Sequence, residues 1–339
     1  MSLLLMESAD LPSVAGDKWT TNTATFAQTV DGRTCWRMVE ASMPLTKNLS
    51  AAQESATITV GLRYLVTGTS NGTTNNGICT FYGIGGTVLH VRVTNTASGA
   101  IAVYRNASNL LGTSAAGLLP INTWVYLEFQ VTCHDTAGAV TVKADGVTVL
   151  TLTNVDTRNA GADALIDQVR FGAQDVGSLK YAYVRDVVVM NDAGTTLNGP
   201  IGPCIVEARL ATAAGDLTAW TPNTGANYAA VDDPAANDGD TTFVEALTPV
   251  RDTYTMADLV AVGSNIKAVQ AHVVARYNTA PLNVATTLRR SSTNSDGTAS
   301  VPTGSYGSKA VTIWETDPVA AGAWTVANFN ATQFGVVSS

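Results

Sequence analysis

Short motifs that could support nucleophilic catalysis are the first features to test in this chain. Gly68-Thr69-Ser70-Asn71-Gly72 matches the G-x-S-x-G pattern of Ser-dependent hydrolysis. The pattern supports catalysis only where a strand precedes the serine and a helix follows it, so that the hydroxyl sits on a strained turn. Here the motif lies in a loop of Thr, Asn and Gly, and no helix is predicted after it. We interpret it as a chance match.

Paired carboxylates would support the cleavage of glycosidic bonds, because one serves as acid and the other as nucleophile or base. Only Glu315-Thr316-Asp317 begins such a pattern, and Pro318 follows it without a second Glu. The histidines are isolated, with none at the spacing of a metal-ligand pair. His90 and His272 fall on the polar side of predicted strands, where contact with solvent is expected. The sequence therefore predicts no catalytic residues and a protein that is not an enzyme.

One stretch concentrates carboxylates and amides at a spacing that could serve a cation. Hard cations such as Ca²⁺ take six to eight oxygen ligands, which acidic loops on β-sandwiches can supply. The D-x-[DN]-x-[DN]-G pattern is interrupted by Pro234, Ala235 and Ala236. A solvated turn is therefore the favoured interpretation, with a Ca²⁺ site as the alternative. The candidate ligands are Asp232, Asp233, Asn237, Asp238 and Asp240.

Aromatic residues within or near polar loops could bind carbohydrate. An aromatic ring stacks on the C–H face of a sugar, while neighbouring Asn and Asp orient the hydroxyls. The candidates for such glycan contacts are Trp220, Tyr228, Tyr104 and Tyr306. For Trp220 the alternative is a packing role, in which the indole fills the space between two domains.

Composition excludes several classes of partner. The chain has 339 residues and a formal charge of −8, with no basic cluster, so nucleic-acid binding by phosphate neutralisation is not expected. No stretch approaches the ~20 apolar residues of a membrane-spanning helix. The run from Leu3 to Met6 is too short for a signal peptide and lacks a preceding basic residue. We therefore expect a protein that is made in the cytoplasm and inserts in no membrane.

Alternating apolar and polar residues predict an all-β chain. From Thr123 to Cys133, Val and Leu alternate with polar residues, which is typical of a half-buried strand. Asp145-Gly146 fits a two-residue type I′ hairpin. In that hairpin Ala144 pairs with Val147 and Val142 with Val149, which places these valines on one apolar face. A generic β-meander would give the same pattern. The isolated cysteines are expected to be reduced.

The chain is long enough for two hydrophobic cores, and the break between them is predicted at a Gly- and Pro-rich stretch. We predict two β-sandwich (jelly-roll) domains at residues 1–195 and 204–339, joined by a linker at 196–203. The second domain is expected to begin with a strand at Ile205–Leu210. Its strongest predicted strand is Asn265–Tyr277, and Trp324–Phe334 is expected to begin with one helical turn.

Two sets of residues resemble known families. In the first domain, W-x-x-L-E-F-x-V (from Trp124) and V-x-V-x-A-D-G-V-x-V (from Val140) resemble the back-sheet strands of concanavalin A-like, or laminin G-like, lectin domains. The opening Leu3–Glu7 and Trp19 resemble the start of phage-encoded lectin-like proteins. In the second domain, E-A-R-L, W-T-P-N-T-G-A-N-Y, D-G-D-T-T-F-V, V-R-D-T-Y-x-M and A-W-T-V-A-N-F-N-A-T-Q-F-G-V resemble a module of tailed-phage virion proteins, over most of residues 204–337.

These resemblances imply a non-enzymatic structural protein of a tailed bacteriophage, such as a capsid decoration, a fibre or a tail-associated adhesin. Its expected partners are other virion proteins, further copies of itself as a trimer or multi-copy array, and a host-surface glycan. The expected location is the virion, and no cofactor is expected apart from the Ca²⁺ considered above. The alternatives are a glycan-degrading tail-associated enzyme and a bacterial surface adhesin.

Overall fold

The computed structural model divides the chain into two compact units, residues 1–207 (the first unit) and 208–339 (the second unit). The described residues are 2–9, 19, 21–22, 25–38, 45–67, 76–159, 163–172, 181–233, 237–259, 265–279 and 281–339. Within them the regular elements are strands, apart from one 3-10 turn and one short helix, which confirms the predicted all-β sandwich class. Neither of these helices is long and apolar enough to cross a membrane. The motif Gly68–Gly72 lies outside the described residues.

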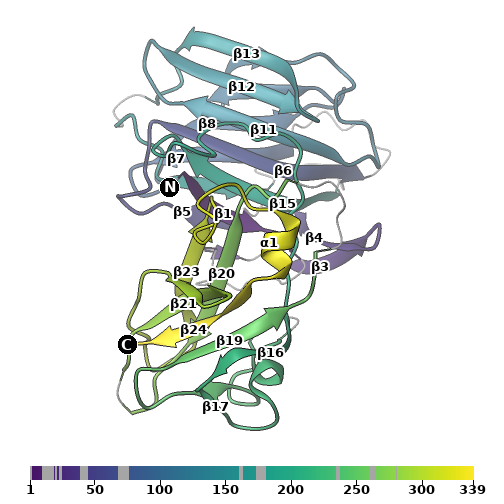
Figure 1. Cartoon of the computed structure of the whole chain (residues 1–339). Helices are drawn as coiled ribbons and strands as arrows, with labels where there is room; N and C mark the ends of the chain where they lie inside the picture. The colour runs from purple at the N-terminus through teal and green to yellow at the C-terminus, as the bar shows by residue number, and fades with distance from the viewer. Residues whose placement is uncertain are drawn as a thin grey trace. The chain divides into compact units, whose positions relative to one another are not determined.

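Two antiparallel sheets form the first unit (Figure 1). In the back sheet, β1 pairs with β15 beside the main strand order. That order is β13 (Val147–Val155), β12 (Gly138–Ala144), β11 (Val125–Thr132), β6 (Thr57–Thr67), β15 (Tyr181–Asn191), β4 (Arg33–Met38) and β3 (Thr25–Val30), with β1 at Leu3–Glu7. The front sheet has the order β10 (Asn109–Thr113), β9 (Ile101–Arg105), β8 (Val88–Asn95), β7 (Asn76–Gly83), β14 (Gln168–Phe171), β5 (Leu45–Asn48) and β2 (Thr21–Asn22).

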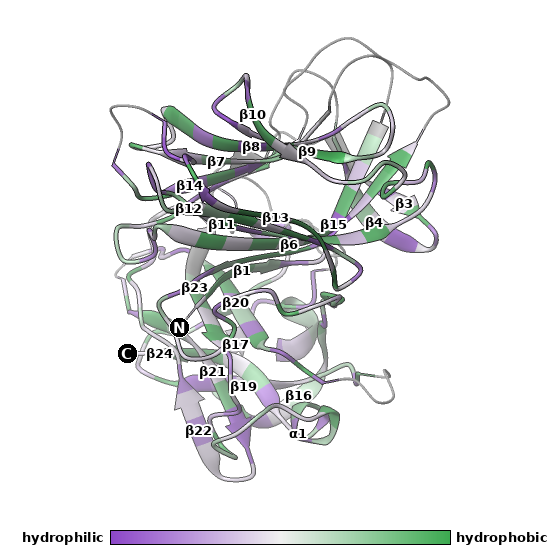
Figure 2. Cartoon of the chain, turned by 90° about the horizontal axis from the view of Figure 1, so that it is seen from above, coloured by the Kyte–Doolittle hydropathy of each residue, from purple (hydrophilic) through white to green (hydrophobic). Residues whose placement is uncertain are grey.

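The core of the first unit lies between the two sheets and follows the predicted alternation. Val125, Leu127, Phe129 and Val131 of β11 belong to one buried cluster with apolar residues of both sheets. Residues of opposite hydropathy alternate along β4 and β6 in Figure 2. Because successive side chains of a strand point to opposite faces of the sheet, every second side chain points into the core and the others point away from it.

The β12–β13 hairpin agrees with the prediction at its turn and departs from it further along. Asp145 and Gly146 have φ values of 47° and 83°, as a type I′ turn requires, and Ala144 pairs with Val147. A bulge then shifts the register, so Val142 pairs with Leu150 and not with Val149. The predicted apolar face is therefore wrong for Val147, whose exposed fraction is 66%.

Strand β13 is an edge of the back sheet, because among the described strands it pairs only with β12. Two register shifts interrupt this pairing, one near Val149 and one at Asn154. Asn154 has a φ of 55°, the left-handed conformation that such a bulge commonly contains. Between the bulges, Leu150–Thr153 pairs regularly with Val142–Ala139.

The stretch predicted as a linker, residues 196–203, belongs to the first unit and is held by the outer face of its back sheet. Glu128 Oε1 accepts hydrogen bonds from the backbone N–H groups of Ile201 (2.7 Å) and Gly202 (3.0 Å). The Tyr126 hydroxyl and the Cys204 thiol lie 3.0 Å apart. Whether 1–195 and 204–339 fold as separate domains stays a prediction.

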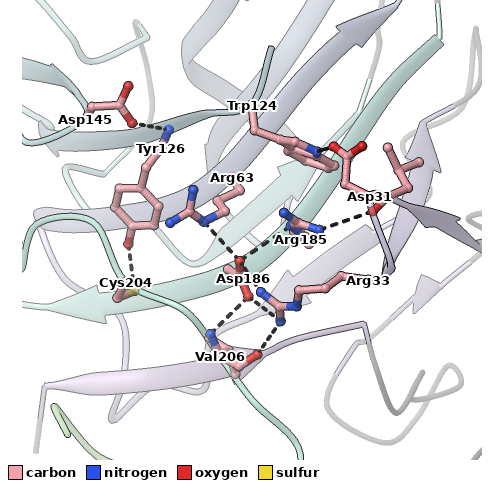
Figure 3. Close-up of polar contacts among 11 residues, drawn as sticks. Asp31, Arg33, Arg63, Trp124, Tyr126, Asp145, Arg185, Asp186, Cys204 and Val206 are labelled. Atoms are coloured by element: carbon pink, nitrogen blue, oxygen red, sulfur yellow. Dashed lines mark hydrogen bonds and ion pairs between the residues drawn. The ribbon is translucent and has the colours of Figure 1, made fainter. Parts of the chain in front are cut away.

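Just after this stretch, Val206 binds a buried carboxylate, Asp186 (Figure 3). Asp186 lies on a bulge of β15 and has a φ of 54°. Arg33 binds both carboxylate oxygens, at 3.1 and 3.0 Å, and also donates to the Val206 carbonyl at 2.9 Å. The Val206 N–H donates to Asp186 Oδ1 at 3.0 Å, and Arg63 lies 3.2 Å from Oδ2. Burial raises the pKa of Asp186, while the bonds from Val206 and Arg33 oppose that rise. This cluster fastens the end of the unit to the sheet.

All four cysteines are free, as expected from their spacing. Cys35, Cys79 and Cys133 are buried, and Cys204 is half-buried. Burial raises the pKa of Cys35 and of Cys204 to about 11, so these thiols stay protonated at neutral pH.

The described part of the second unit contains a five-stranded sheet and two separate two-stranded sheets. The larger sheet has the order β16 (Ala211–Thr218), β19 (Arg251–Met256), β24 (Gln333–Ser338), β21 (Val284–Arg290) and β22 (Thr293–Asp296). The smaller sheets pair β20 (Val269–Ala275) with β23 (Gly307–Trp314), and β17 (Thr221–Pro222) with β18 (Val244–Glu245). The 3-10 turn η1 is Asn227–Ala230, and the helix α1 is Val326–Asn330.

The second unit has a small aromatic core. Trp314 of β23, Phe334 of β24 and Phe329 of α1 belong to one buried cluster, with Phe329 and Phe334 ring centroids 5.5 Å apart. Thr325 caps α1 by accepting a hydrogen bond from the Asn328 N–H, which confirms the predicted helical turn. The expected strand at Ile205–Leu210 is wrong, since the first strand of this unit begins at Ala211.

Candidate functional site

The outer face of the front sheet carries a row of polar side chains that crosses five strands. Tyr104 of β9 is paired with Arg92 of β8, Arg92 with Thr80 of β7, Thr80 with Arg170 of β14, and Arg170 with Thr46 of β5. Residues directly opposite each other in antiparallel strands share one face, so these five side chains line up. The adjacent Val91, Val93, Val103, Val169 and Phe171 belong to the core, which places the row on the opposite face.

Two arginines of this face are stacked on tyrosines. The Arg170 guanidinium carbon lies 3.9 Å from the centroid of the Tyr82 ring, and that of Arg92 lies 5.2 Å from the Tyr104 ring. Each guanidinium therefore lies over an aromatic ring, in an attractive cation–π arrangement. Tyr104 and Arg170 are half-buried, while Arg92, Tyr82 and Thr80 are buried. The partly exposed groups of the row are thus a phenol and a cation.

Arg170 differs from most arginines of this chain in the character of its contacts. Its Nε donates to Gln168 Oε1, one Nη donates to the Gly86 carbonyl, and Gln168 in turn donates to Asn48. Among the described residues these partners are all neutral, so no carboxylate compensates the charge of Arg170. A half-buried cation without a counter-ion attracts an anion from solution, because its charge is only partly screened there.

Two acidic residues near this face, Asp156 and Asp167, are engaged by other groups. Asp167 accepts hydrogen bonds from the backbone N–H groups of Gly85 and Gly86, the latter at 3.2 Å. Asp156 forms an ion pair with Arg105. Both carboxylates therefore fix loops at the border of the sheet.

His90 is buried, so the expectation that it faces solvent is wrong. Its Nδ1 accepts a hydrogen bond from the Asn159 N–H at 3.2 Å, and burial lowers its pKa. A neutral imidazole that accepts at Nδ1 carries its proton on Nε2. We assign His90 to holding the chain after β13 against the front sheet.

The four aromatic residues proposed for glycan contact lie at three different places. Tyr104 belongs to the front-sheet row. Trp220 and Tyr228 lie close together in the second unit, since Asn227 donates to the Trp220 carbonyl at 2.6 Å and precedes Tyr228 in η1. Tyr306 donates its hydroxyl proton to Asp240 at 2.9 Å. The structure therefore does not gather them into one site.

The environment of Trp220 is a buried carboxylate network of the second unit. Asp252 accepts hydrogen bonds from the Trp220 N–H (3.3 Å), the Asn227 amide (2.7 Å) and the Tyr254 hydroxyl (2.8 Å). The Trp220 indole N–H donates to the Val250 carbonyl at 3.4 Å. These contacts orient Trp220 within its own unit.

The carboxylates proposed as Ca²⁺ ligands are mostly used within their own loop. Asp238 accepts from the Thr242 N–H (3.2 Å) and hydroxyl (2.8 Å), and Asn237 accepts from the Gly239 N–H (3.0 Å). Asp233 accepts weakly from the Asp238 N–H, at 3.4 Å. In the part of the chain that the structure describes, which omits 234–236, no three His, Cys, Asp or Glu side chains converge as a metal site.

Asp317, the second carboxylate of the Glu315-Thr316-Asp317 pattern, also has a structural role. Asp317 is buried and binds Arg290 through two bonds of 2.7 and 3.0 Å, as well as the Asn328 amide at 2.9 Å. Burial by itself raises the pKa of Asp317, but the bonds from Arg290 and from backbone N–H groups outweigh it and lower the pKa overall.

Sequence reasoning missed the Arg170–Tyr82 pair because its members lie on strands far apart in the chain. The alternation Gln168-Val169-Arg170-Phe171 does place Arg170 on a polar face. Its neighbours across the sheet depend on strand pairing that no local pattern encodes.

Comparison with known proteins gives fold-level likenesses only. No family model and no curated protein matches the chain. An endo-β-1,4-glucuronan lyase from the fungus Trichoderma reesei matches 55% of this chain and 94% of its own, with 12% identity and a TM-score of 0.37. Alginate lyase Aly36B matches 55% of this chain and 96% of its own, with 12% identity and a TM-score of 0.38. A carbohydrate esterase of the Shiga toxin-encoding bacteriophage phi24B matches 56% of this chain and 97% of its own, with 16% identity and a TM-score of 0.34.

These likenesses correct one expectation from the sequence. The matching structures are mostly named as glycan lyases, sialidases and a carbohydrate esterase, so the prediction that the chain is not an enzyme is wrong. What this chain shares with those carbohydrate-active proteins is the β-sandwich fold.

Proposed function

We propose that the protein is a glycan-acting enzyme whose first unit binds an acidic polysaccharide across the front-sheet row. The observation that carries this proposal is the half-buried guanidinium of Arg170, whose contacts among the described residues are all neutral. A sugar carboxylate would form a charge-assisted hydrogen bond with it, which is stronger than a bond between neutral groups. Tyr104 lies three strands from Arg170, a separation of about 14 Å, and offers a ring for the C–H face of a sugar further along the same polysaccharide.

The reaction that suits this site best is β-elimination next to a uronate carboxylate. The proton leaves the carbon that carries the carboxylate, the bond to the glycosidic oxygen on the adjacent carbon breaks, and a C=C bond forms while that oxygen takes up a proton. Arg170 would stabilise the charge that develops on the carboxylate, because Gln168, Gly86 and the Tyr82 ring already hold its guanidinium in place. Hydrolysis would need two available carboxylates, but Asp156 and Asp167 are engaged by Arg105 and by backbone N–H groups.

Alginate and glucuronan are the first probes, since they are the substrates named for two of the matching lyases. Binding is measured by affinity electrophoresis, and elimination by the ultraviolet absorbance of unsaturated uronate products. We expect Arg170→Ala to abolish retardation and product formation. Arg105→Ala removes the same charge from an arginine that is paired with Asp156, and is expected to keep both. Equal behaviour of the two variants, or no retardation of the unaltered protein by either polymer, would overturn the proposal.

We also propose that the chain is part of a tailed-phage particle, on its head or its tail, where it acts on host-surface glycans as a trimer or multi-copy array. Support comes from the resemblance of residues 204–337 to a virion module. Mass spectrometry of purified particles should detect the chain in several copies per particle. Its absence from particles, together with a monomeric mass of the pure protein at high concentration, would contradict this location.

A further inference from the structure

A second polar cluster with an aromatic ring lies in the second unit. Asp240 lies in the turn that precedes β18, Arg276 directly follows β20, and Tyr306 directly precedes β23. Strands β20 and β23 pair in antiparallel fashion, and a bridge joins Arg276 to Thr303. The Tyr277 N–H also donates to the Thr303 carbonyl at 2.9 Å. Arg276 and Tyr306 are therefore held by paired backbone.

The contacts of Asp240 are concentrated on one of its two oxygens. Its Oδ1 accepts from Arg276 Nε (3.2 Å), from Arg276 Nη2 (2.7 Å) and from the Tyr306 hydroxyl (2.9 Å). Among the described residues, Oδ2 of Asp240 and Nη1 of Arg276 have no partner. The Asp240 side chain is 62% exposed, and the bonds from Arg276 and Tyr306 lower its pKa. The cluster thus presents a carboxylate acceptor and a guanidinium donor to solvent.

The aromatic part of the cluster is Tyr306. Its ring centroid lies 5.1 Å from the Arg276 guanidinium carbon, and the residue is half-buried. An acceptor, a donor and an aromatic ring side by side match a sugar that has two adjacent hydroxyls and an apolar C–H face. One hydroxyl donates to the carboxylate, the other accepts from the guanidinium, and the C–H groups contact the ring.

We propose that Asp240, Arg276 and Tyr306 form a second sugar-binding site, selective for neutral hexopyranoses with a vicinal diol. Asp240 already compensates the charge of Arg276, so a uronate carboxylate gains little attraction from this site, and the exposed Oδ2 of Asp240 repels it at contact distance. The ion pair with Arg276 leaves Asp240 with little attraction for a cation. This site has the opposite charge preference to the front-sheet row, and it stands independently of the function proposed for the first unit.

Saturation-transfer-difference NMR on the full chain carrying Arg170→Ala tests the site, because that substitution removes the uronate contact proposed for the first unit. The probes are methyl α-D-mannopyranoside, methyl β-D-galactopyranoside, methyl β-D-glucopyranoside and methyl β-D-glucuronide. We expect transfer to the C–H protons of at least one neutral probe and much weaker transfer to the glucuronide. Tyr306→Ala should reduce the transfer several-fold, whereas Tyr306→Phe, which keeps the ring, should retain most of it. Tyr277→Ala is the matched control and should retain the transfer, because Tyr277 is also a half-buried tyrosine of the second unit and its side chain is not part of the cluster.

A separate variant distinguishes sugar binding from a merely structural role. Asp240→Asn keeps the shape and an acceptor oxygen but removes the charge, so it should raise the transfer to the glucuronide relative to the neutral probes. Thermal unfolding of each variant monitors the fold, and Arg276→Lys replaces Tyr306→Ala if that variant does not fold. No transfer to any neutral probe, or the same transfer in Tyr306→Ala as in the unaltered protein, would refute the site.

Discussion

The carboxylate of Asp186 is fully buried and binds Arg33, Arg63 and the Val206 N–H, so it holds the end of the first unit against the back sheet. Removing one partner of a buried ion pair leaves the other charge uncompensated. We expect Asp186→Asn to lower the free energy of unfolding by about 3–5 kcal/mol. Chemical denaturation followed by tryptophan fluorescence measures this loss.

The control for Asp186 is an ion pair at the surface. Asp135 pairs with Arg158, and its side chain is 49% exposed. Asp135→Asn should cost at most about 1 kcal/mol, because solvent screens exposed pairs. A similar loss in both variants would mean that the Asp186 cluster contributes no more than a surface contact.

Asp317 predicts how the stability of the second unit depends on pH. Its pKa lies below the usual 3.8, since the bonds from Arg290 and the backbone outweigh the effect of burial. A carboxyl whose pKa is lowered by folding contributes stability above its unfolded pKa and loses it as the pH falls through the folded value. We expect the melting temperature to fall on acidification below about pH 4. In Asp317→Asn the protein should be less stable at pH 6, and the difference should shrink toward pH 3.

The exposed Asp258 supplies the comparison for this titration. Asp258→Asn should follow the unaltered protein across the whole pH range. If the difference in melting temperature between Asp317→Asn and the unaltered protein stayed constant down to pH 3, the Asp317 carboxylate would not be the group that titrates.

At the scale of the elements, the close approach of β24 to β19 depends on Gly335. A Cβ atom at Gly335 would lie 1.9 Å from the Asp252 carbonyl oxygen, which belongs to the backbone of β19 and cannot rotate away. Gly335→Ala should therefore destabilise the protein by about 1–3 kcal/mol or prevent folding. At Gly304 nothing lies within 4 Å of such a Cβ, so Gly304→Ala should leave stability almost unchanged in the same melting experiment. Comparable melting temperatures for the two variants would show that the two strands can separate without cost.

Local patterns predicted strands well, because alternation and turn residues are properties of neighbouring positions. The face of β11 and the turn at Asp145-Gly146 follow directly from their residues. The bulge after Val142 could not be predicted from neighbouring residues, since it depends on how two whole strands pair. The same limit applies to the candidate site, where Arg170 and Tyr82 meet only through the pairing of β14 with β7. Tyr306 was found from its type, whereas its partners Arg276 and Asp240 required the structure.

At the scale of the whole molecule, the position of the first unit's end can be tested by truncation. A chain of residues 1–207 keeps Val206 and the backbone groups that bind Glu128 and Asp186, whereas residues 1–195 lack them. The shorter chain leaves these two buried carboxylates without those hydrogen bonds, which costs free energy. We expect 1–207 to melt at a clearly higher temperature than 1–195. Equal melting temperatures would place the end of the folded unit before residue 196.

The two proposed sites give one chain opposite electrostatic preferences. The uncompensated Arg170 of the first unit favours an anionic sugar, and the exposed Asp240 of the second unit disfavours one. A host surface that carries both kinds of sugar could engage both units of one chain, and linked binding events raise the overall affinity without any new contact.

The interrupted pairing of β13 has a consequence for association between copies of the chain at high concentration. An open strand edge offers unsatisfied backbone groups to any passing chain, and long flat edges promote fibrils and precipitation. Here the bulges near Val149 and at Asn154 leave only Leu150–Thr153 with a regular backbone. A regular segment of four residues between two bulges is too short and too twisted to pair with the same strand of another molecule. Neighbouring copies can therefore be packed densely without forming a continuous sheet through this edge.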